Sequence, residues 1–174
     1  MNTQVERVHA VLSTTPERWQ RLVSTLPVDL LTRPPAEGEW SALGCLRHLL
    51  EAERFNFPVR FRAFLAGQDF TPFDPNQKHA DIEALTPEQL ADMFAHARQE
   101  SLILLKQVKD EDLERMAQHP QFGTVTLSQM LQTWAAHDLM HTVQAERALM
   151  QPFMLACGPW RTFFRDHEVA AAKG

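Results

Sequence analysis

The residues best suited to do chemistry in this chain are two histidines four positions apart, His137 and His141. Residues four apart lie on one face of an α-helix, with Cβ atoms roughly 5–6 Å apart, so two imidazoles in this register can bind one divalent ion. The pair is a weak signal by itself, and because position 138 is Asp, the HExxH motif of zinc proteases is absent. A site with chemistry of its own needs a third ligand.

His48 is the best candidate for that third ligand. It stands next to Leu49 and Leu50, so its side chain is expected to point at least partly inward. A histidine among leucines is either a core residue with satisfied hydrogen bonds or a ligand, and three buried imidazoles would leave polar nitrogens that a metal ion can satisfy. The other four candidates are expected on the surface: His79, His96, His119 and His167.

A di-iron centre is the competing metal architecture for a helical bundle. It requires two Glu-x-x-His motifs and two further glutamates. Only Glu6 to His9 matches this motif here, so we set the di-iron interpretation aside.

Three side chains at helical spacing from the histidines are candidates for catalysis or substrate binding. Glu51, about one turn after His48, is predicted to act as a base or to orient a ligand; an ordinary surface carboxylate is the alternative. Gln144 is predicted to bind a ligand or substrate, or else to make a hydrogen bond inside the bundle. Trp134 is predicted to form a wall of the pocket, with plain core packing as the alternative.

Two further polar residues lie close to the histidines in the sequence. Asp138 is rotated about 100° around the helix from His137, which favours a supporting or structural partner over a ligand. Cys45 lies one turn before His48 and could supply a fourth, thiolate ligand, but a small buried apolar residue is the favoured interpretation.

Four long helical patterns must position these residues. Pro16 should kink or split the first pattern, Pro58 should bend the second, and the fourth should stop before Pro152. The patterns span Thr3 to Leu26, Trp40 to Ala66, Thr86 to Val108, and Leu127 to Met150.

Irregular connections separate these helices. They are expected at residues 31–38, 68–85 and 109–126, and a short helix is expected after Gly158-Pro159. The fold class is therefore all-α: a four-helix bundle with two long connections and a short C-terminal helix, as a single domain over residues 1–174.

Composition excludes several classes of function. The chain has 174 residues and a net charge of -5, without a basic patch or a glycine-rich phosphate-binding motif, so we expect no nucleic-acid partner. It has no apolar run of about 18 residues, so no membrane segment is expected. Two cysteines and no secretion signal favour a reducing cytoplasm. Phe70, Phe73 and Phe153 would support a homodimer if they are exposed, or would fold inward.

The chain resembles the DinB/YfiT-like family of metal-dependent enzymes over nearly its whole length. The residues that carry the resemblance are Glu39-Trp40-Ser41, His48-Leu49, Glu53, Phe122-Gly123, Thr126-Leu127, the stretch from Trp134 to Gln144, and Gly158-Pro159-Trp160. The resemblance implies a bundle with up-down-down-up topology and a nickel- or zinc-type site made by His48, His137 and His141. Some mycothiol-using relatives have Glu in place of His137 and an extra C-terminal domain, which we do not expect in a chain that ends at Gly174.

Three protein ligands would leave open positions on the metal, which is typical of catalytic sites. An open position can hold water, whose pKa falls to about 7, or a thiol, which binds as thiolate. The resemblance favours a thiol S-transferase, in which a low-molecular-weight thiol attacks a small-molecule electrophile; a hydrolase is also consistent. The alternatives are a non-catalytic metal- or ligand-binding module of the stress response, and a metal-free bundle with histidines in its core.

Overall fold

The computed structural model describes residues 3–74, 77 and 79–170. Most of the described chain is helical, and the one sheet has two short strands. The elements are α1 (Thr3–Thr25), α2 (Val28–Thr32), α3 (Ala42–Phe55), α4 (Phe57–Ala66), α5 (Ala80–Glu83), α6 (Pro87–Leu105), the 3-10 helix η1 (Asp110–Glu114), β1 (Met116–His119), β2 (Gly123–Thr126), α7 (Leu127–Ala156) and the 3-10 helix η2 (Gly158–His167).

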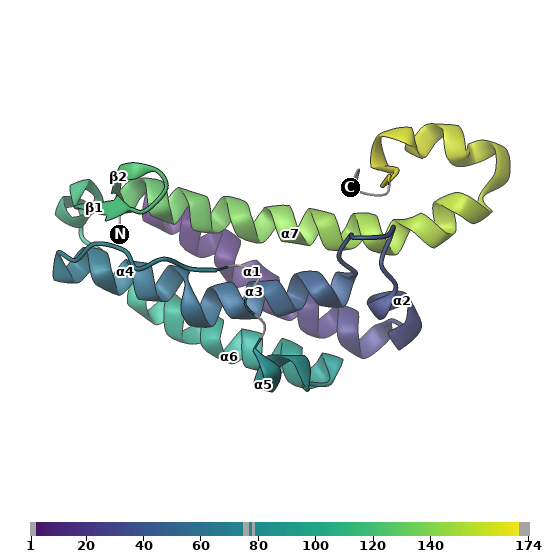
Figure 1. The fold of residues 1–174 in the computed structure, drawn as a ribbon, viewed down its shortest axis with the longest axis horizontal. Coiled ribbons are helices and arrows are strands. Elements are labelled where there is room, and N and C mark those ends of the chain that lie inside the picture. The colour runs from purple at the N-terminus through teal and green to yellow at the C-terminus, as the bar shows by residue number, and fades with distance from the viewer. Residues whose placement is uncertain (1–2, 75–76, 78, 171–174) are drawn as a thin grey trace.

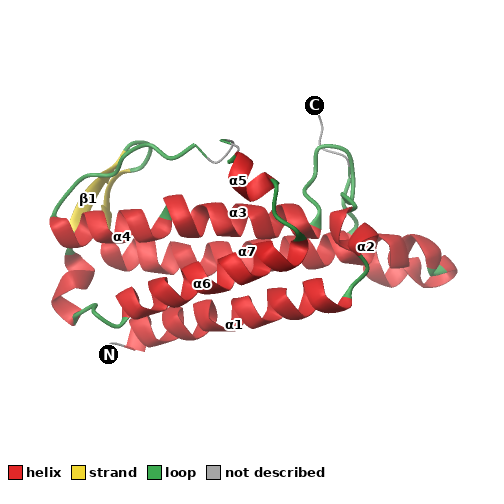
Figure 2. Cartoon of the chain, turned by 90° about the horizontal axis from the view of Figure 1, so that it is seen from below, coloured by secondary structure: helices red, strands yellow, loops and turns green. Residues whose placement is uncertain are grey.

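The long helices form a four-helix bundle with up-down-down-up topology. In Figure 1, α1 and α7 run in one direction, whereas the α3–α4 arm and α6 run in the other. Each of α1 and α3 packs against both α6 and α7, and Figure 2 shows the same bundle from below. The predicted all-α bundle is confirmed, and two elements, α3 and α7, lie side by side where the candidate histidines are.

The helix ends follow local sequence rules. Ser41, Thr86 and Thr126 each cap a helix, and each side-chain oxygen accepts a hydrogen bond from the backbone N–H three residues later. Such caps stabilise a helix by about 1 kcal/mol each. Gly67 ends α4 in the left-handed conformation, with φ of 66°, which glycine adopts without strain.

α1 continues through Pro16 instead of splitting there. Proline has no N–H to offer the carbonyl of Leu12, four residues earlier. That carbonyl instead accepts from the Arg98 Nη1 group at 3.0 Å. A side chain from α6 thus replaces the hydrogen bond that the proline removes, and the helix stays intact.

The other two prolines have different outcomes. The predicted bend at Pro58 is a break between two helices, because Asn56 leaves the helical conformation with φ of −119° and ψ of −83°. In contrast, α7 does not stop at Met150 but continues through Pro152 to Ala156. A proline costs one hydrogen bond and does not end a helix whose flanking turns are otherwise paired.

The long connections contain more structure than expected. The segment 68–85 includes the one-turn helix α5, and part of the segment 31–38 belongs to α2. Residues 109–126 form η1 and an antiparallel hairpin in which Met116 lies opposite Thr126 and His119 opposite Gly123. Gly123 has φ of 71°, a conformation that favours glycine.

The helices and exposed side chains of the bundle bear on the predictions about a membrane segment and a homodimer. Within the described ranges, no helix is long and apolar enough to cross a membrane. Phe70 is buried against Phe64, Phe73 is half-buried, and Phe153 is 65% exposed. Of the three phenylalanines considered for a dimer, only Phe153 therefore presents a large apolar surface.

Candidate metal centre

Three histidines from two helices converge between α3 and α7. The ligand atoms of His48, His137 and His141 all lie within 4.8 Å of one another. The Nε2 atoms of His48 and His137 are 3.1 Å apart. Two nitrogens bound to one tetrahedral zinc ion at about 2.05 Å would be about 3.3 Å apart, so this separation fits ligands of a shared ion.

All three imidazoles are held in the neutral form that binds metals. Burial, followed by the charge of the nearby His141, lowers the pKa of His48 to about 4. Burial, followed by the charges of His141, His48 and Arg98, lowers the pKa of His137 to about 3. The pKa of His141 is also lowered by burial, although Gln144 and Asp138 oppose the shift. A neutral imidazole has a free lone pair for a metal ion.

Gln144 fixes the orientation of His141. The Nδ1 atom of His141 lies 2.9 Å from the Gln144 Oε1 atom, so the ring donates its Nδ1 proton and keeps a lone pair on Nε2. From its spacing in the sequence, Gln144 is expected to bind a substrate or a ligand, or to make a hydrogen bond inside the bundle. The structure shows the side chain bound to a candidate metal ligand and, at the same time, lining a pocket.

We expect Gln144→Leu to weaken metal binding by about ten- to a hundredfold, because loss of a partner that orients a ligand typically has this effect. Competition with a metallochromic chelator would measure the affinity. Gln132→Leu, at an exposed position of the same helix, is the matched control and should leave the affinity unchanged. Equal affinities for all three proteins would contradict a role for Gln144 in orienting His141.

Aromatic rings enclose the histidine cluster. Trp40, just before α3, lies 4.8 Å from the His48 ring and stacks on the His141 ring at 5.6 Å, measured between centroids. Phe57 meets the His137 ring edge-on at 5.1 Å. Trp40 is still 37% exposed, so it covers the cluster from the solvent side. These rings limit contact with water and favour neutral imidazoles.

A buried ion network supports the helix that carries two of the histidines. Arg98 of α6 pairs with Asp138 of α7 at 2.7 Å and with Glu53 of α3 at 2.9 Å, and all three side chains are 1% exposed. The Thr15 hydroxyl of α1 donates to Asp138 at 2.6 Å. Burial alone would lower the pKa of Arg98, but Glu53 and Asp138 outweigh it and raise that pKa above its ordinary value. The network therefore joins all four helices beside His137 and keeps Arg98 charged.

The structure gives Asp138 the structural role that the sequence favoured, but Arg98 was missed. Its position carried a signal, because Phe94, Arg98, Leu102 and Leu105 share one face of α6, and a charged residue on an apolar face needs a buried partner. The sequence did not reveal which carboxylates those partners were.

Trp134 occupies a supporting position rather than a pocket wall. Its ring is 1% exposed and stacks on Phe57 at 5.3 Å, and its indole N–H donates to the Glu53 carboxylate at 3.3 Å. Because Phe57 in turn touches His137, Trp134 packs behind the cluster and offers no surface to a substrate.

Glu51 is buried, but the charged residues around it are His79, Glu83 and Arg47 and not the three histidines of the cluster. Its pKa is raised by burial, is lowered by His79 and Arg47, and is raised further by Glu83. Within the described part of the chain it makes no hydrogen bond to the three imidazoles, so its predicted role as a base stays a prediction.

The Cys45 thiol is fully buried in the core, and burial raises its pKa to about 12, which opposes the thiolate form that would bind a metal.

The remaining histidines lie apart from the cluster. His96 and His167 are exposed, as expected. His79 and His119 are half-buried: His79 stacks on Phe55 at 4.1 Å, and His119 stacks on Phe122 at 4.7 Å in the hairpin. Among the described residues, the three-histidine group is the one set of metal-binding side chains that lies close enough together to hold an ion.

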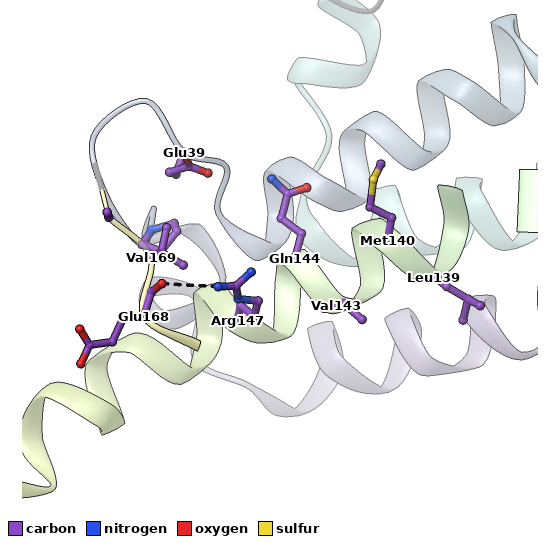
Figure 3. A pocket seen from close by; sticks show the side chains of 10 residues that line it. Glu39, Leu139, Met140, Val143, Gln144, Arg147, Glu168 and Val169 are labelled. Carbon is purple, nitrogen blue, oxygen red and sulfur yellow. Dashed lines mark hydrogen bonds between the residues drawn. The ribbon is translucent and has the colours of Figure 1, made fainter. Parts of the chain in front are cut away.

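An open pocket of about 670 Å³ begins beside the cluster and follows α7 (Figure 3). It is lined by Pro35, Glu39, Leu139, Met140, Val143, Gln144, Arg147, Glu168, Val169 and Ala170. Two residues connect it to the histidines. Gln144 bonds His141, and Glu39 precedes Trp40, which stacks on the same ring. A small molecule in this pocket would lie next to the candidate metal centre.

Comparison with known proteins agrees with this fold. Residues 11–145 match the family model of the DinB superfamily. YfiT from Bacillus subtilis, a probable metal-dependent hydrolase with an unusual four-helix bundle topology, is a structural neighbour with a TM-score of 0.75 and 18% identity. The match covers 88% of this chain and 90% of YfiT.

A second structural neighbour is a mycothiol-dependent maleylpyruvate isomerase, with a TM-score of 0.63 and 16% identity. The match covers 83% of this chain but 63% of the isomerase. No curated protein sequence matches significantly. At these identities the two structures establish the shared bundle, and the chemistry has to be argued from the residues of this chain.

Proposed function

The chain belongs to the DinB superfamily, and from this membership and its histidine cluster we propose that it is a divalent-metal-dependent enzyme acting on a small molecule. The observation that carries the proposal is that three imidazoles converge at one place. Their surroundings favour the neutral form, and the Nε2 atoms of two of them are 3.1 Å apart. His48, His137 and His141 would hold one ion, with zinc or nickel preferred, since imidazole suits both.

When bound, a divalent ion supplies a Lewis acid that favours deprotonation of water or of a thiol at an open position. The protein's own residues set the conditions for this chemistry. Gln144 holds the tautomer of His141, while Trp40 and Phe57 exclude water from the imidazoles. The Arg98 network holds α7 in register with α3, so that the two halves of the cluster stay together.

We favour a thiol S-transferase, in which a low-molecular-weight thiol is the cosubstrate and attacks an electrophile. Support comes from the mycothiol-dependent neighbour, although the match spans 63% of that protein. A hydrolase is the second candidate, and it is supported by the more completely matched YfiT. Consumption of the thiol together with the electrophile would identify the transferase, whereas turnover without any thiol would identify the hydrolase.

The first test is the metal content of the protein purified without a polyhistidine tag. We expect about one equivalent of zinc or nickel per chain in the wild type and none in His48→Ala, because two imidazoles bind an ion far more weakly than three. Elemental analysis by mass spectrometry gives both numbers.

His96→Ala, at an exposed position on α6, is the matched control and should keep the wild-type content. A wild type that contains no metal, and takes none up on reconstitution with zinc or nickel, would contradict the proposal. The protein would then be a bundle with a non-catalytic role for its histidines.

A further inference from the structure

The pocket beside the histidine cluster has three walls of different origin. One wall is α7, the second is the segment before α3 that carries Glu39, and the third is the segment after η2 with Glu168 and Val169. Figure 3 shows Gln144 and Arg147 projecting from α7, with Arg147 directed towards Glu168 and Val169. The third wall is fixed to α7, since the Gln151 side chain bonds the backbone of His167 at 2.9 Å and of Val169 at 3.2 Å.

Arg147 is a cation that has no carboxylate partner among the residues that the structure describes. Its Nη2 group donates to the backbone oxygens of Asp166 at 3.3 Å and Glu168 at 3.4 Å. Its Nε atom is buried and has no hydrogen-bond partner among the described residues. Neither oxygen that it contacts carries a formal charge, so none of the described residues that it contacts neutralises the positive charge of the guanidinium.

The carboxylates that line the pocket do not supply this partner. Glu168 is already paired, because its Oε1 atom accepts from the Arg161 Nε group at 2.8 Å. Glu39 stands on the opposite segment and, within the described ranges, forms no ion pair with Arg147. Among the described residues that line it, the pocket therefore presents one guanidinium without a carboxylate partner. Glu39 would oppose an anion there, whereas the charge of Glu168 is offset by Arg161.

The rest of the α7 wall is apolar. Leu139, Met140 and Val143 line the pocket and are 46%, 55% and 58% exposed. Met140, Val143 and Arg147 share one side of the helix, so an apolar strip leads along α7 to the guanidinium. His141 and Arg147 are six residues apart, which corresponds to about 9 Å along the helix axis.

From this arrangement we infer that the pocket binds small amphiphilic carboxylates, with the carboxylate on Arg147 and the hydrocarbon body along Met140 and Val143. The inference rests on the proposed function in one respect: the end of the bound molecule away from its carboxylate would point along α7 towards His141, where the reaction would occur. Arginine suits this role because its guanidinium is always charged, and the Nη1 group can donate a charge-assisted hydrogen bond to a carboxylate while Nη2 stays on the backbone oxygens.

The test uses hexanoate, hexylamine and hexanol as probes, titrated calorimetrically into the metal-loaded full-length protein. We expect hexanoate to bind about tenfold or more tightly than the other two, because a charge-assisted hydrogen bond has that effect on an equilibrium constant. Arg147→Met should reduce hexanoate affinity by a similar factor. Glu39→Gln, which removes the opposing charge, should increase it.

Two matched variants separate charge from shape. Arg147→Lys keeps the cation and should retain most of the affinity, whereas Gln151→Ala loosens the same segment without removing a charge and should also retain it. Equal binding of hexylamine and hexanoate, unchanged affinity in Arg147→Met, or an equal loss in Gln151→Ala would each overturn the inference.

His137→Ala separates this inference from the proposed function. If this variant loses the metal but still binds hexanoate, the pocket inference stands independently of catalysis. If hexanoate binding is lost in His137→Ala and retained in Arg147→Met, the carboxylate binds at the histidine cluster, and the inference is wrong while the metal centre is supported.

Discussion

Arg98→Met should destabilise the protein by about 3–5 kcal/mol, the usual cost of removing one member of a buried ion network. Methionine fills a similar length but leaves the Glu53 and Asp138 carboxylates without a cation, and both are 1% exposed. It also removes the Arg98 donor from the Leu12 carbonyl, which Pro16 already deprives of its helical N–H. Urea unfolding at neutral pH, followed by far-ultraviolet circular dichroism, measures the change.

Two comparisons make this prediction specific. Arg18→Met removes an exposed ion pair, in which the Arg18 side chain is 48% exposed and the Glu146 side chain 45%. It should lower the free energy of unfolding by less than about 1 kcal/mol. Adding Glu53→Gln and Asp138→Asn to Arg98→Met removes the unpaired charges and should recover part of the loss. If Arg98→Met costs no more than Arg18→Met, the network does not hold the helices together as described.

Local rules account for the part of the fold that was predictable from the sequence. The caps at Ser41, Thr86 and Thr126 depend on a side chain and the backbone three residues later, so their positions follow from short-range spacing. The same spacing indicates that His137 and His141 share a helix face. The position of His48 opposite this pair could be inferred only from the family resemblance or from the fold. The role of all three as metal ligands stays a prediction.

Tertiary pairing explains what the sequence did not reveal. Pro16 interrupts a hydrogen bond that only Arg98, 82 residues later, restores, and no local pattern indicates such a partner. Trp40 was identified only as part of a motif, because its stacking on His141 depends on how α3 meets α7. The hairpin at residues 116–126 was expected to be irregular because its strands are only four residues each, too short for a clear alternating pattern.

Acid should destabilise the metal-free protein more steeply than its carboxylates alone would cause. Burial lowers the pKa of His48 to about 4 and of His137 to about 3 from 6.5. Between pH 6.5 and these lowered pKa values, the unfolded chain binds protons that the folded chain does not. The free energy of unfolding therefore falls as the pH decreases from about 6.5. Each imidazole changes the folding equilibrium by up to about tenfold per pH unit, and the two together by up to about a hundredfold per pH unit.

The comparison that isolates this effect is the double variant His48→Gln with His137→Gln, because glutamine keeps a polar side chain at each position but takes up no proton. Urea unfolding of the chelator-treated proteins from pH 7 to pH 4 should show a much shallower loss of stability in the double variant. His96→Gln, on an exposed face, should follow the wild type. Carboxylates titrate equally in all three proteins, so a difference in slope reports the two imidazoles. Identical slopes in all three would mean that burial does not keep His48 and His137 neutral. The cluster would then not hold these two imidazoles in the form that binds a metal ion.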